Sequence, residues 1–254
     1  ASPRRASIHQ GASSVSNAFR LPFLALLYKR YLANQDSAAF LRKVSQSYTP
    51  GTLERLARHR TVEVRRAAVL ALGFVGGFDS NDTMGRALTD SDRTVRILAE
   101  NGIRSLWNHA GTLEECRALA IVIRLNAAQQ YRRAEQKATR LLEKSPWFAE
   151  AWNQRAVAHF ALGEFDEAIH DCHQALELNP YHFAAAAGIG QAYLHLGNHV
   201  AALDGFRRAL RLNPNLEGAR AQIALLKDVE RREPELQALC DRYVERYGKV
   251  TGGR

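Results

Sequence analysis

A repeat with a fixed period occupies the second half of the chain. Residues 162–180 read LGEFDEAIHDCHQALELNP, and residues 196–214 read LGNHVAALDGFRRALRLNP. At an offset of 34 the two segments share eight identities in nineteen positions, all at small, apolar or turn residues. The Leu-Gly pairs end one helix and the Asn-Pro pairs end the next. Self-similarity at a fixed period therefore predicts stacked helical units that bury their apolar faces against one another.

The pattern resembles the tetratricopeptide repeat, a 34-residue pair of antiparallel helices. If Pro180 and Pro214 are the terminal prolines, the units run 149–182 and 183–216, and a degenerate copy precedes them at 115–148. Where one unit lacks a residue of the family pattern, the other unit has it. The matching residues are Trp152, Ala168, Ala175 and Pro180 in the first unit, and Gly190, Tyr193, Ala202, Phe206, Ala209 and Pro214 in the second.

A shorter repeat lies in the first half of the chain. Residues 61–73 and 92–104 align at an offset of 31, with Val64-Arg65 over Val95-Arg96. This motif resembles the HEAT repeat, particularly the short form of bilin-lyase-type proteins. The first copy has Thr61 where the second has Asp92, so the family's Asp–Arg ladder is expected to be at most half present.

These repeats predict an all-α fold, a right-handed α-solenoid of antiparallel helix pairs with HEAT-like units followed by tetratricopeptide units. Thr112 and Glu115 form a capping box that opens a helix between the two arrays, and no Pro/Gly/Ser-rich linker separates them. We therefore expect one continuous solenoid. Its expected divisions are a flexible basic tail at 1–16, N-terminal capping helices at 17–47, HEAT-like repeats at 48–112, tetratricopeptide repeats at 113–233, and a closing helix and tail at 234–254.

Positive charge is concentrated at the N-terminal end. Of 35 Lys+Arg and 26 Asp+Glu, residues 1–60 hold ten and two, or +8, which leaves 25 and 24, or +1, for residues 61–254. A basic end with interleaved aromatic residues favours attachment to an anionic membrane surface or to nucleic acid. The apolar helix expected at 20–33 has two interpretations, a cap on the open end of the solenoid or such an attachment. The candidate basic surface is Arg20, Lys29, Arg30, Arg42, Lys43, Arg55 and Arg58.

The search for catalytic and metal chemistry gives no candidate. Three separated cysteines without a CxxC pair argue against a disulfide framework or a zinc site, and they favour the cytoplasm or another reducing compartment, with a membrane-peripheral location as an option. His170 and His173 lack a third ligand. We therefore expect no enzyme activity, no metal, no cofactor and no small-molecule substrate. The Ser- and Arg-rich start also resembles a transit peptide, so processing of the N-terminus stays open.

The resemblance to tetratricopeptide repeats implies a concave surface built from the first helix of each pair. On this chain that surface is small, apolar and mildly polar, with no Lys or Arg, which suits a helix or an extended apolar segment of another protein. The predicted function is a non-enzymatic interaction scaffold, although the chain's own closure could fill the same space. The candidate groove residues are Asn153, Val157, Phe160, Ala184, Ala187, Gln191, Leu194, His195 and Leu225.

Overall fold

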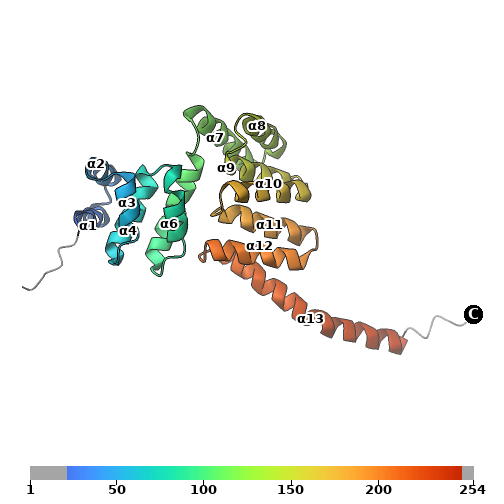
Figure 1. Ribbon diagram of the computed structural model, residues 1–254. Helices are drawn as coiled ribbons and strands as arrows, with labels where there is room; N and C mark the ends of the chain where they lie inside the picture. The colour runs from blue at the N-terminus through green and yellow to red at the C-terminus, as the bar shows by residue number, and fades with distance from the viewer. Residues whose placement is uncertain (1–21, 248–254) are drawn as a thin grey trace, which may run out of the picture.

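The computed structural model describes residues 22–247, and this part of the chain is all-helical (Figure 1). It contains thirteen α-helices, one short 3₁₀ turn at Phe78–Ser80 and no strand. The all-α expectation is therefore confirmed. The expected tail at 1–16, Arg20 and residues 248–254 lie outside the described range.

The N-terminal half consists of two N-terminal helices followed by two short-long helix pairs. The short helices α3 and α5 begin at residues 50 and 81, and the long helices α4 and α6 begin at residues 62 and 93. Both offsets equal the one found in the sequence, so the shorter period is a repeat of structure. Apolar residues of α1 and α2, such as Leu24 and Val44, are buried in the same core as α4. The helices are α1 (Phe23–Asn34), α2 (Ser37–Ser47), α3 (Pro50–Leu56), α4 (Val62–Val75), α5 (Asn81–Ala87) and α6 (Arg93–Asn108).

Equivalent arginines make equivalent hydrogen bonds in the two pairs. The Arg65 guanidinium donates to the carbonyl oxygens of residues 59 and 60, and that of Arg96 donates to those of residues 90 and 91. Arg65 also forms a two-bond ion pair with Asp90, and Arg66 forms one with Asp92. The Arg66 hydrogen bond lowers the pKa of Asp92 to about 2. Ion pairs therefore join α4 to the turn between α5 and α6.

The helices of the C-terminal half begin at the spacing of the longer sequence repeat. Helix starts at residues 131, 165 and 199, and at 149, 183 and 217, reproduce the offset of the sequence repeat. The Thr112–Glu115 capping box that opens this half is present as predicted. The helices are α7 (Leu113–Ala127), α8 (Tyr131–Lys144), α9 (Ala149–Ala161), α10 (Phe165–Leu178), α11 (Phe183–His195), α12 (His199–Leu212) and α13 (Glu217–Tyr247).

The turn inside each helix pair has one residue in the left-handed backbone region. Gly163 has φ +80° and Gly197 has φ +73°, and Gln129 occupies the equivalent position of the degenerate unit with φ 57°. Glycine adopts this conformation without steric cost, whereas a residue with a Cβ is strained there. The degenerate unit therefore keeps the geometry of the turn although it has lost the glycine.

The C-terminal end differs from the expectation. The sequence predicts a separate closing helix that starts at residue 234, but α13 is a single helix that extends away from the array (Figure 1). A proline inside a helix removes one backbone donor and can kink the helix without ending it. The expected closing helix is therefore corrected to a continuation of α13.

The two halves share a core. Phe183 of α11 belongs to the same buried cluster as the helices of the N-terminal half, and Ala184, Leu212 and Leu216 pack against that cluster. In Figure 1, α6 runs past the ends of α9 and α11. The N-terminal half thus contacts the edge of the second array as well as preceding it in the chain.

Candidate functional site

Trp107 lies at the centre of the junction between the two halves. Its side chain is 2% exposed, and its ring stacks on His182 with a centroid distance of 4.4 Å and an interplanar angle of 17°. Its indole N–H donates to Asn81 Oδ1 at 2.7 Å, and Asn81 Nδ2 donates to Asn179 Oδ1 at 2.9 Å. Trp107 of α6 therefore connects to the loop before α11 in two ways. Its ring stacks on His182, and its hydrogen bond to Asn81 of α5 continues through the hydrogen bond from Asn81 to Asn179.

His182 and Glu150 form a buried polar pair next to Trp107. The backbone N–H of Ala185 donates to His182 Nδ1 at 3.1 Å, so Nε2 carries the proton and donates to Glu150 Oε2 at 2.9 Å. Burial by itself raises the pKa of Glu150, but hydrogen bonds from His182, Gln154 and Asn153 outweigh it, and the pKa lies below its ordinary value. These contacts explain the pair as structural, with no need for acid–base chemistry.

Polar and cation–π contacts extend the junction along the edge of the array. Tyr181 Oη donates to Asp82 Oδ1 at 2.6 Å, and Arg96 Nε donates to Asn215 Oδ1 at 3.2 Å. The Arg104 guanidinium lies 4.7 Å from the centroid of the Phe183 ring. Sequence reasoning did not identify any of these contacts, because no spacing rule relates residues that lie so far apart in the chain.

Two of the predicted groove residues lie beside the junction, one of them buried and the other half-buried. Asn153 is buried and its amide donates to Glu150 Oε1 at 3.2 Å. Ala184 is half-buried and packs against the core of the N-terminal half. A third, Ala187, is half-buried and packs within the second array. The chain itself therefore contacts the inner end of the predicted groove, one of the two possibilities that the sequence left open.

The outer positions stay accessible. Val157 is 43% exposed and Leu225 is 58% exposed, and the half-buried Gln191 lies between them in the repeat register. The rings of Phe160 and His195 meet edge to face at 5.0 Å. Val229, 42% exposed, occupies the position of His195 one unit further on, and the register could have identified it. We call the following set the first-helix face: Val157, Phe160, Gln191, Leu194, His195, Leu225 and Val229.

The predicted basic surface divides into two parts. Arg30, Arg42 and Lys43 line a cavity of about 240 Å³ between α1 and α2, beside the aromatic rings of Phe23 and Tyr31. Lys29 is exposed on α1 next to them. The other members lie on and just after α3, where Arg55 donates to Thr52 and Arg58 is 3.8 Å from a carboxylate oxygen of Asp82.

The remaining reactive groups have structural explanations. Burial raises the pKa of the Cys172 thiol to about 12, so this sulfur stays protonated and inert. Within residues 22–247 no three His, Cys, Asp or Glu side chains gather in a way that could hold a metal ion. Across the same range, none of the helices combines the length and the apolar character needed to cross a membrane.

The side-by-side helix pairs in a fixed register define an all-helical repeat protein. Residues 149–182 and 184–216 each match the family model of the tetratricopeptide repeat. These segments are tetratricopeptide repeats, and the boundaries predicted from the sequence agree with the matches to within one residue. The matches do not reach residues 48–112, so the likeness of that segment to HEAT repeats stays a prediction.

Relatives with tetratricopeptide repeats cover parts of the chain. A TPR repeat-containing protein of Rhizobium etli is 28% identical over 144 residues, which cover 55% of this chain and 67% of the relative. The SGT1 homolog of Bos taurus is 36% identical over 80 residues, which cover 32% of this chain and only 24% of the relative. The solved structure of the first TPR of Spaghetti (RPAP3), bound to an HSP90 peptide, is 23% identical with a TM-score of 0.45, and covers 47% of this chain and 94% of that one. The repeats and relatives together suggest a protein-interaction scaffold.

Proposed function

We propose that the protein is a non-enzymatic scaffold that binds a helix or an extended apolar segment of another protein on its first-helix face. The observation that carries the proposal is the exposure of Val157, Leu225 and Val229 on α9 and α13. Val157 and Leu225 share one register position, with Gln191 between them, and Val229 lies one helical turn from Leu225 on α13. Large exposed apolar patches on a folded protein are commonly interaction sites.

The composition of this face supports an apolar ligand. It contains no Lys, Arg, Asp or Glu, and His195 is its one ionisable member. Because the junction covers Asn153 and Ala184, the binding surface begins at Val157 and continues towards α13. A segment bound there would contact α9, α11 and α13 and would leave the junction intact.

Substitution of one exposed residue on this face tests the proposal. We expect Leu225→Asp and Val157→Asp each to weaken partner recovery about tenfold or more, because a carboxylate facing an apolar ligand must lose its water. The measurement is affinity purification with quantitative mass spectrometry, with circular dichroism as the check on folding. Val200→Asp is the matched control, since Val200 is 71% exposed on α12, outside the face. Equal recovery of the same partners by all variants would contradict the proposal.

A second function, attachment to an anionic membrane surface, is supported by the outer side of α1. Phe23 and Leu26 are about half exposed there, and Lys29 and Arg30 lie on the same side at helical spacing. Apolar side chains flanked by cations suit an interfacial helix. The other side of α1 is buried against α4, so this helix would bind as part of the folded domain.

Vesicle binding tests this second function. The double variant Lys29→Glu, Arg30→Glu should bind vesicles of phosphatidylcholine and phosphatidylserine at least about tenfold more weakly, since each base near an anionic surface contributes about 1 kcal/mol. Co-sedimentation at two salt concentrations measures this. Arg207→Glu, Arg211→Glu is the control of equal charge, on exposed positions of α12. Equal loss in both variants, or binding to nucleic acid without binding to vesicles, would reject the membrane assignment.

A further inference from the structure

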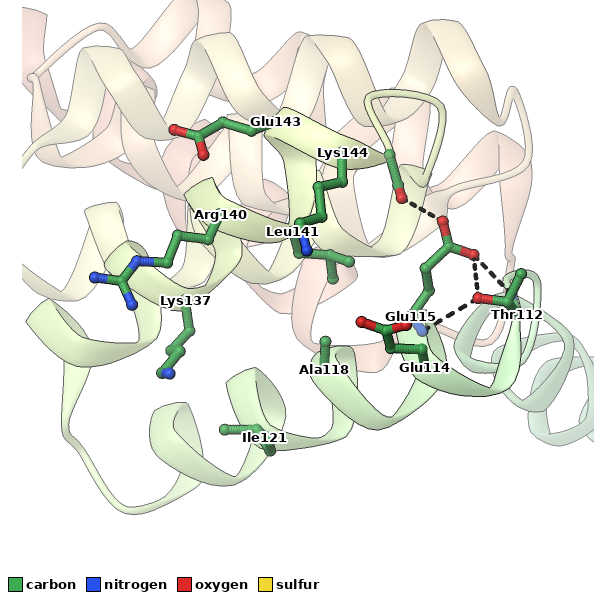
Figure 2. A pocket seen from close by; sticks show the side chains of 11 residues that line it. Thr112, Glu114, Glu115, Ala118, Ile121, Lys137, Arg140, Leu141, Glu143 and Lys144 are labelled. Atoms are coloured by element: carbon green, nitrogen blue, oxygen red, sulfur yellow. Dashed lines mark hydrogen bonds between the residues drawn. The ribbon is translucent and has the colours of Figure 1, made fainter.

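A cleft of about 690 Å³ lies between α7 and α8, away from the first-helix face (Figure 2). Figure 2 shows Ala118 and Ile121 on α7 on one side, and Lys137, Arg140 and Lys144 on α8 on the other. Ile121 is 42% exposed. The α7 side of the cleft is thus partly apolar, and the α8 side carries a row of basic residues.

Alignment with the later units at the 34-residue offset shows that the cleft lies on the side of the helix pair where a preceding unit would stack. Ile121 and Leu141 correspond to Arg155 and Ala175 in the next unit, and to Ile189 and Ala209 in the unit after it. In both later units these positions face the preceding unit or the interior and are buried or half-buried. On α7 and α8 the position of Leu141 is also buried, at 5% exposed, but Ile121 is 42% exposed, so the outer face is open around Ile121.

In the later units a helix covers this face. Arg155 Nη1 donates to Thr139 of α8 at 3.1 Å, and Ala158 of α9 packs in one cluster with residues of α8. Likewise Ile189 of α11 packs in one cluster with Cys172 and Leu176 of α10. The second helix of the preceding unit is therefore the element that fits the face. Within the described residues no preceding tetratricopeptide unit supplies such a helix to α7 and α8, because α6 packs with α4, α5 and the edge of the array.

The charges of the cleft define the helix that would fit. Lys137, Arg140 and Lys144 form one stripe along α8, and none of them has an ion pair within the described residues. Of the three carboxylates in the lining, Glu115 is already engaged, because it accepts from Thr112 N at 2.7 Å, from Thr112 Oγ1 and from Ser145 Oγ. The lining thus contains three bases and two acids without an ion pair in the described part of the chain, Glu114 on α7 and Glu143 on α8 beside the bases. The exposed Arg117 and Arg133 lie at neighbouring helical positions.

The chain's own ends do not complement this surface. Residues 1–21 carry three arginines and no acid, and residues 248–254 carry one lysine, one arginine and no acid. We propose that the cleft binds an acidic amphipathic helix of another protein, in the position that the second helix of a preceding repeat would occupy. Its apolar side would contact Ala118 and Ile121, and its carboxylates would pair with Lys137, Arg140 and Lys144. This surface is independent of the first-helix face.

A designed peptide tests the proposal on the full chain. The probe is a capped helical peptide of Leu, Ala and Glu of about 15 residues, the length of α7, with leucines at spacings of three and four. We expect saturable binding by fluorescence anisotropy, with a Kd of about 1–100 µM that rises with salt. The variant Lys137→Glu, Arg140→Glu, Lys144→Glu should weaken binding at least about tenfold. Ile121→Asp should weaken it as well.

Controls separate this site from general attraction to a basic protein. The variant Arg207→Glu, Arg211→Glu, Lys227→Glu changes the net charge equally, at exposed positions of α12 and α13, and should bind the peptide like the wild type. A peptide with Gln in place of each Glu should bind at least about tenfold more weakly. Equal binding of the two peptides, equal loss in the two triple variants, or no saturable binding below about 1 mM would each overturn the proposal. So would self-association of the chain that the Lys137→Glu, Arg140→Glu, Lys144→Glu variant abolishes, since the occupant would then be a second copy.

Discussion

Trp107→Ala is expected to lower the free energy of unfolding by about 3–5 kcal/mol, the range found for removal of large aromatic side chains from protein cores. The substitution removes the stacking on His182 and the contact with Phe183 at 5.2 Å, and it leaves the Asn81 carbonyl without its indole donor in a buried site. The measurement is urea unfolding followed by circular dichroism. The slope of the unfolding free energy against urea concentration should also change, because the two halves should then unfold less cooperatively.

Trp147→Ala is the matched control for this prediction. Trp147 is 47% exposed and stacks on Phe148, with a centroid distance of 5.3 Å. Its loss should cost about 1 kcal/mol or less. A similar small effect for both tryptophans would mean that the junction contributes little to stability and that the two halves fold as separate units.

Arg155→Met is expected to destabilise the second array by about 3–5 kcal/mol, because it leaves the buried Asp171 carboxylate without its arginine, and among the described residues the only other basic group beside it is His159 Nε2 at 3.8 Å. The Arg155 guanidinium forms two hydrogen bonds to Asp171, at 2.7 and 2.9 Å, and the Asp171 side chain is only 2% exposed. The same guanidinium lies 4.7 Å from the centroid of the Trp152 ring. Thermal and urea unfolding would measure the loss.

The double variant Arg155→Met, Asp171→Leu separates the cost of an unpaired charge from the loss of packing. Replacement of a buried ion pair by apolar residues of similar size is often neutral, so the double variant should recover most of the stability. If the double variant were as unstable as Arg155→Met, packing of the arginine on Trp152 and its hydrogen bond to Thr139 would be the larger contribution.

The local pattern of the chain predicted the elements of the C-terminal half well. The Leu-Gly and Asn-Pro pairs mark turns whose spacing reappears in the helix starts at 149, 183 and 217. The same register extended to residue 129, where Gln129 adopts the left-handed conformation of its glycine counterparts. In the first half, the offset that aligns Val64-Arg65 with Val95-Arg96 reappears as the matching hydrogen bonds of Arg65 and Arg96. Such features depend on residues close together in the chain, which is why periodicity reports them.

The candidate sites were predictable only in part. The register placed Val157 and Leu225 on one face, and they are exposed there. It also placed Asn153 and Ala184 on that face, but the junction buries Asn153 and packs Ala184 against the core of the N-terminal half. The α7–α8 cleft was not identified from the sequence, because a basic stripe such as Lys137, Arg140 and Lys144 is equally typical of a solvated helix face, and only the structure shows a cleft beside it.

The sequence by itself determined that the chain consists of helix pairs, where most of those pairs begin and end, and which residues pack within a pair. The tertiary structure alone decided that α6 packs against the edge of the second array, that α13 continues past Pro234, and that the first tetratricopeptide-like pair has an open face. The reason is physical. Pairing within a unit depends on neighbouring residues, whereas the meeting of Trp107 with His182 depends on small rotations between successive pairs that add up along the stack.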